Sequence, residues 1–84
     1  MALVSDSGEA RLIALIAETL RVPKPEITDT LDMETTSTWD SLSHMQLIAG
    51  IEDEFAIELT ADDIVAMRSL AGIKSVLRAR SVAL

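Results

Sequence analysis

The chain has 84 residues, a net charge of −7, no cysteine and a single histidine. At this length we expect one domain over residues 1–84, with no second domain and no large catalytic cleft. Disulfides, cysteine-ligated zinc and a His-rich metal site are excluded, and we expect no metal site. Hydrophobic residues make up 49% and aromatic residues 2%, with few glycines and prolines. This composition predicts an aliphatic core in an all-α fold.

Acidic and basic residues are unevenly distributed. Residues 26–67 hold eleven acidic residues and no Lys or Arg, whereas residues 68–84 hold four basic residues and no acidic one. The acidic middle of the chain should repel nucleic acid and anionic lipid and attract basic protein surfaces. The alternative is that the acidic residues only keep a small domain in solution. No apolar run approaches the roughly 18 residues of a membrane span, and the first ten residues lack the basic segment of a signal peptide. We therefore expect a cytoplasmic monomer that binds neither nucleic acid nor membrane.

The first predicted element is a helix over about 7–21. Apolar residues recur there at helical spacing. Asp6 and Glu9 have the spacing of a capping box, and the prolines at 23 and 25 end the helix because proline lacks a backbone N–H.

The sequence of residues 22–40 is rich in Thr, Asp and Ser and lacks periodicity, which predicts a long connection without regular structure. We expect the apolar side chains of Ile27, Leu31 and Met33 to anchor it to the core. Long loops in small domains are often functional. A calcium loop starting at Asp29 is excluded, because its sixth and twelfth positions are Glu34 and Asp40 instead of Gly and Glu.

A second helix is predicted over 41–55. At 100° per residue, one arc of this helix is apolar and the opposite arc is polar, with Leu42 and Ala49 at the border. His44 and Glu52 are polar members of the apolar arc. The other residues of that arc are Met45, Leu47, Ile48, Ile51 and Phe55, and the polar arc holds Ser43, Gln46, Gly50, Asp53 and Glu54.

Two further helices complete the prediction. Thr60 and Asp63 have the spacing of a capping box that begins a short helix ending near Met67. Ser69 is a suitable N-cap for the last helix, whose inward residues are Leu70, Ile73, Val76 and Leu77. The chain is thus expected to form four helices, of which the third is short.

Ser41 stands at the predicted start of the second helix, after Trp39 and Asp40. The free N–H groups and dipole of a helix N-terminus stabilise a phosphate on the first residue. The alternative is that Ser41 or Asp40 is only an N-cap. A hydrolase triad of Ser41, His44 and Asp40 is rejected, because Ser41 and His44 share one helix and neither a strained nucleophile elbow nor an oxyanion hole is present.

The segment Trp39-Asp40-Ser41-Leu42, with the apolar and acidic residues that follow it through Leu59, resembles the acyl carrier proteins. The resemblance covers about residues 8–80, and it implies an acyl-carrier-protein-like four-helix bundle with a long first loop and a short third helix. It also implies that a phosphopantetheinyl transferase joins 4′-phosphopantetheine from coenzyme A to the Ser41 hydroxyl through a phosphodiester. The thiol of this arm then carries acyl groups as thioesters, and the chain itself is not an enzyme.

We therefore expect a free-standing acyl carrier protein that presents its cargo to acyl-loading and acyl-processing enzymes with basic docking surfaces. Ser43 and Gln46 stand where carriers of fatty-acid synthesis commonly have acidic residues, and Trp39 stands where a small residue is frequent. These departures favour a specialised polyketide, nonribosomal or fatty-acid-like pathway. The alternatives are an aminoacyl or peptidyl carrier and a helical adaptor without the prosthetic group.

Two further sets of residues are expected to serve Ser41. Partner enzymes should recognise an exposed face of the second helix, made of Asp40, Leu42, Gln46, Ala49 and Asp53. A cargo pocket should open between the second and third helices, lined by His44, Leu47, Ile51, Leu59, Ile64 and Met67, with His44 at its mouth. The alternatives are an ordinary solvated helix face, a closed core and, for His44, a half-exposed position.

Overall fold

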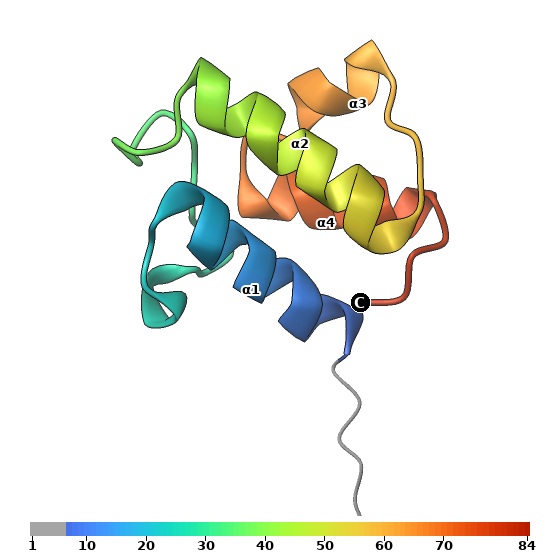
Figure 1. Ribbon diagram of the computed structural model, residues 1–84, viewed down its shortest axis with the longest axis horizontal. Helices are drawn as coiled ribbons and strands as arrows, with labels where there is room; N and C mark the ends of the chain where they lie inside the picture. The colour runs from blue at the N-terminus through green and yellow to red at the C-terminus, as the bar shows by residue number, and fades with distance from the viewer. Residues whose placement is uncertain (1–6) are drawn as a thin grey trace, which may run out of the picture.

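The structure is a computed structural model, and it describes residues 7–84. Its α-helices are α1 (Gly8–Leu20), α2 (Ser41–Phe55), α3 (Ala61–Ala66) and α4 (Leu70–Ala79), and a 3₁₀ turn, η1 (Lys24–Glu26), lies in the first connection. Residues 7–84 contain no strand. The expected all-α fold with a short third helix and a long first connection is confirmed (Figure 1).

Each helix begins at a polar N-cap residue. Ser7 caps α1 by accepting a hydrogen bond from the Ala10 N–H at 3.0 Å, whereas the capping box predicted on Asp6 lies outside the described residues. Thr60 caps α3 in the predicted capping box with Asp63, and Ser69 caps α4. These side chains take up N–H groups that have no partner within the helix.

The core lies among α1, α2 and α4 (Figure 1). The helical spacing of the apolar residues places their side chains on the inner face of each helix. The anchors expected in the first connection are confirmed, because Ile27 is buried and Leu31 and Met33 pack against the core. The fully buried core side chains are Leu12, Ile16, Leu20, Leu47, Ile51, Met67, Leu70, Ile73 and Leu77.

The first turn of α2 departs from the predicted arcs. Met45, expected inside, is 52% exposed, and Ser43, expected outside, is buried. The hydroxyl of Ser43 donates a hydrogen bond to the Thr38 carbonyl at 2.8 Å and accepts one from the Asp40 N–H at 2.9 Å. These local hydrogen bonds hold Ser43 against the preceding loop. The spacing of apolar residues, on which the predicted arcs rest, gives no information about such bonds.

Glu52 has a structural role that explains its place on the apolar arc. Its Oε2 accepts a hydrogen bond from the backbone N–H of Leu59 at 2.8 Å. The carboxylate therefore fixes the connection between α2 and α3 and gives a partner to a backbone donor that no helix pairs.

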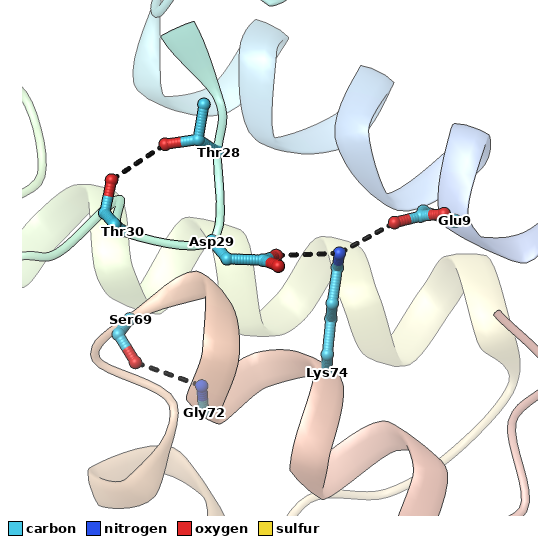
Figure 2. A network of polar contacts seen from close by, with 7 residues as sticks. All are labelled: Glu9, Thr28, Asp29, Thr30, Ser69, Gly72 and Lys74. Atoms are coloured by element: carbon cyan, nitrogen blue, oxygen red, sulfur yellow. Dashed lines mark hydrogen bonds and ion pairs between the residues drawn. The ribbon is translucent and has the colours of Figure 1, made fainter.

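A partly buried lysine, Lys74, ties α4 to two distant segments (Figure 2). Lys74 Nζ donates hydrogen bonds to Glu9 at 2.7 Å and to Asp29 at 3.0 Å, and its side chain is only 12% exposed. The hydrogen bond to Glu9, and after it the one to Asp29, raises the pKa of Lys74 above its usual value. Asp29 belongs to the first connection, so this one ammonium group holds the loop and α1 to α4.

Backbone contacts hold the same connection near the start of α4. The Met33 N–H donates to the Arg68 carbonyl at 2.9 Å, and the Leu70 N–H donates to the Leu31 carbonyl at 3.0 Å. The first connection therefore lies against the junction of α3 and α4 and, although long, has a fixed path.

Close approaches explain two of the glycines. A Cβ on Gly72 would overlap the carbonyl oxygen of Ala66, so a side chain there would push α4 away from α3. A Cβ on Gly8 would overlap the carbonyl oxygen of Ala83. The start of α1 therefore meets the C-terminal segment, at the end of the molecule away from the start of α2 (Figure 1).

Candidate functional site

Ser41 is the first residue of α2, and its side chain is exposed. Asp40 is the N-cap, since its carboxylate accepts a hydrogen bond from the Ser43 N–H at 2.9 Å, and Ser43 completes the capping box. The Ser41 hydroxyl takes part in neither contact. Of the two N-cap alternatives, Asp40 is therefore the cap, and the exposed Ser41 takes no part in the capping box.

The electrostatics at the start of α2 are set by the Asp40 carboxylate. The backbone N–H of Ser43, and after it the Ser43 hydroxyl, hold the pKa of Asp40 below its usual value. Asp40 is therefore an anion at neutral pH, next to the exposed hydroxyl of Ser41 and at the helix end where negative charge is favoured.

An open hollow of about 290 Å³ adjoins Ser41, and we call it the surface hollow. It lies between the first turns of α2 and helix α3, with one residue of the first connection and one residue after α3 at its sides. Its wall is mostly apolar. Val65 is 67% exposed there, so apolar surface faces solvent. The residues that line the hollow are Met33, Ser41, His44, Met45, Ile64, Val65 and Arg68.

The residues predicted for a cargo pocket lie in different environments. His44 and Ile64 line the surface hollow, and Leu59 is partly buried against the core. Leu47, Ile51 and Met67 do not line the hollow, because each is fully buried in the core. A pocket that uses all six residues therefore stays a prediction.

His44 is 7% exposed, so the half-exposed alternative was wrong. Its Nδ1 lies 3.0 Å from Nε1 of Trp39, and its Nε2 lies 2.9 Å from the carbonyl oxygen of Ile64. The indole N–H can only donate and the carbonyl can only accept. The imidazole is therefore neutral, with its proton on Nε2, and connects Trp39 before α2 to Ile64 of α3.

Four residues of the surface hollow were missed by the sequence analysis: Met33, Met45, Val65 and Arg68. Periodicity placed Met45 inside, and Val65 carries no pattern of its own. Arg68 had a signal, because it is the first basic residue after the acidic middle of the chain.

The five residues predicted to contact partner enzymes (Asp40, Leu42, Gln46, Ala49 and Asp53) are all exposed. The acidic residues beside them have other contacts. Glu54 forms an ion pair with Arg11 at 2.8 Å, and Glu52 accepts the Leu59 N–H. Within residues 7–84, Asp53 makes neither kind of contact. Of the acids 52–54, it is the exposed one without an ion pair or hydrogen bond to another described residue.

A family model described as the phosphopantetheine attachment site matches residues 10–77. The match covers well over half of the chain, so the chain belongs to this family. It is a carrier protein of the kind that holds 4′-phosphopantetheine covalently, and the resemblance to acyl carrier proteins agrees with this assignment. Carrier domains of this family are generally non-catalytic.

Two absences hold for the part of the chain that the structure describes. No group of three or more His, Asp or Glu side chains is arranged there to hold a metal ion. None of its helices combines the length and the apolarity that crossing a membrane requires.

Proposed function

We propose that Ser41 is the attachment residue and that the chain is an acyl carrier protein that is not itself an enzyme. One observation carries the proposal: the Ser41 hydroxyl is exposed at the N-terminus of α2, is not used by the cap, and lies beside an apolar hollow. The bound group supplies a thiol that carries acyl groups as thioesters, and the cysteine-free chain has no thiol of its own.

The residues around Ser41 fit a phosphodiester there. The first N–H groups of α2 and the helix dipole favour an anion on Ser41. Arg68, on the wall of the same hollow, adds a positive charge to a region that is otherwise acidic. These groups offset the repulsion from Asp40.

We infer acyl cargo instead of aminoacyl or peptidyl cargo because the surface hollow is mostly apolar. The departures at Trp39, Ser43 and Gln46 favour a specialised biosynthetic pathway. We place the protein in the cytoplasm, since coenzyme A must be available for its modification.

Partner enzymes are proposed to dock on the exposed face that holds Asp40, Leu42, Gln46, Ala49 and Asp53. They comprise the phosphopantetheinyl transferase and the enzymes that load and process the acyl group. The two acids steer basic partner surfaces to this face, and Leu42 gives them an exposed apolar contact next to Ser41.

Mass spectrometry after incubation with coenzyme A and a promiscuous transferase tests the attachment residue. We expect a mass gain of one phosphopantetheine for the wild type and for Ser37→Ala, a control at an exposed serine of the preceding loop. Ser41→Ala should gain nothing and keep its helical circular dichroism, because Asp40 is the cap. Uptake of the arm by Ser41→Ala would show that Ser41 is misassigned. An unchanged wild-type mass would favour the helical adaptor.

The docking face is tested by the rate of this transfer at low salt. Asp53→Lys should slow it several-fold, and the effect should shrink as salt screens the charges. Leu42→Ala should slow transfer at any salt concentration. Glu18→Lys makes the same charge change at an exposed position of α1 and should have little effect. Equal rates for Asp53→Lys and Glu18→Lys would refute this face.

A further inference from the structure

The contacts of His44 separate two apolar regions that are close along α2. His44 lines the surface hollow, whereas Leu47 and Ile51, about one and two turns further along the helix, belong to the closed core. Trp39, which is also buried, holds one side of the imidazole, and the Ile64 carbonyl holds the other. We call this arrangement the Trp39–His44–Ile64 bridge.

We propose that the Trp39–His44–Ile64 bridge determines cargo specificity, because it keeps an acyl chain carried on Ser41 in the surface hollow and out of the core. The favoured cargo is then a short acyl group that needs no deep burial. This inference rests on the proposed function of Ser41 as the carrier residue.

The hydrogen bonds explain why the bridge stays closed. A chain that entered between α2 and α3 would have to separate His44 from Ile64 or from Trp39. Either change leaves a buried polar atom without its partner, which is unfavourable. Among residues 7–84, every buried side-chain nitrogen and oxygen has a hydrogen-bond partner, so the closed arrangement has no such defect.

The packing on either side of the bridge agrees with this reading. Met67, which follows α3, is fully buried, and no lining residue of the surface hollow is among the fully buried side chains. The hollow, at about 290 Å³, is at the lower limit of the volumes usual for small-molecule sites, and it is open to solvent. It therefore suits a short chain better than a long one.

Chemical shifts of the octanoyl-loaded protein, compared with those of the unloaded arm-bearing protein, test the proposal. In the wild type we expect shifts at Met45 and Val65 and none at Leu47, Ile51 or Met67. His44→Ala opens the space, and Trp39→Phe removes the donor while it keeps a ring. In both variants the three core residues should shift on octanoyl loading. Ser75→Ala, at an exposed position of α4, is the control and should behave as the wild type.

Thioester hydrolysis gives a second measurement. In the wild type, octanoyl and acetyl thioesters should hydrolyse at similar rates, because both are reached by water. In His44→Ala the octanoyl thioester should become several-fold more resistant. If His44→Ala does not fold, Trp39→Phe carries the test.

Two results would overturn the proposal. The first is a change in the chemical shifts of Leu47, Ile51 or Met67 when the wild type is loaded with octanoyl. The second is no change at these residues when the folded variants are loaded with the same chain. Failure of the proposed function has a different result, the unchanged mass after the transferase reaction. In that case the chain is attached chemically to the variant Ser41→Cys. Its introduced cysteine is the only thiol of the protein, and it is alkylated with an iodoacetamide derivative of octanoyl-pantetheine. The same shifts then decide where the chain lies.

Discussion

The hydrogen bond between Trp39 and His44 leads to a quantitative prediction. Trp39→Phe keeps an aromatic ring but removes the N–H that donates to His44 Nδ1, in a site where His44 is 7% exposed. Loss of the bond together with the unsatisfied buried acceptor should cost about 1–3 kcal/mol. In a domain of this size that corresponds to a fall in Tm on the order of 10 °C.

His44→Phe should cost a similar amount, because it leaves the Trp39 N–H without an acceptor. The Ile64 carbonyl loses one donor but still accepts the Met67 N–H at 3.3 Å. When both rings become Phe, neither half of the Trp39–His44 bond is left buried and unpaired. The double variant should therefore be more stable than the sum of the single effects predicts, by about 1 kcal/mol or more.

Urea unfolding at neutral pH measures this coupling. Circular dichroism is the suitable signal, because Trp39 is the only tryptophan and its fluorescence is lost in two of the variants. Single effects that add within about 0.5 kcal/mol would refute the reasoning, since independent sites behave in that way.

Other predictions concern two glycines and two ionised side chains. Gly50→Ala should raise stability by up to about 1 kcal/mol through helix propensity, because its Cβ would meet only a flexible side-chain end at 3.0 Å. Gly72→Ala should lower stability, since overlap with the Ala66 backbone outweighs the same gain. Because the pKa of Lys74 is raised in the folded protein, its charged form stabilises the fold. This stabilisation is complete below the usual pKa of 10.5 and is lost as the pH rises through the raised value. Glu52→Ala should cost about 1–2 kcal/mol, because the N–H it accepts from loses its partner.

Each of these is checked by thermal or urea unfolding against a matched variant. Gly50→Ala and Gly72→Ala are controls for one another, and a stabilised Gly72→Ala would show that α4 moves away freely. The wild type and Arg78→Met should lose stability at alkaline pH, whereas Lys74→Met should lack this loss. A loss of stability of equal size in all three proteins would show that a group other than Lys74 causes it. Glu52→Gln keeps an acceptor oxygen, so destabilisation equal to that of Glu52→Ala would contradict the hydrogen bond.

The helices could be predicted because their causes are local. Caps at Thr60 and Ser69 and the apolar spacing of each helix lie within a few residues of the element they define. The exposed position of Ser41 was predictable for the same reason, since it follows from the start of a helix.

What could not be predicted depends on partners distant in sequence or on competing local bonds. The acceptor of the His44 proton is a backbone carbonyl twenty residues away, and a carbonyl has no residue type to recognise. Ser43 is buried by hydrogen bonds, not by apolarity. The surface hollow is made by side chains from three separate stretches of the chain, so its lining follows from the packing of α3 and not from the pattern of α2.

The contact between Gly8 and Ala83 has a consequence for protein engineering. The two ends of the described chain meet at one end of the molecule, and α2 begins at the other (Figure 1). Adjacent termini are the geometry that domain insertion and circular permutation require. The carrier can therefore be built into an exposed loop of a host protein as a cassette, held by two short linkers, with Ser41 presented on the side away from the host.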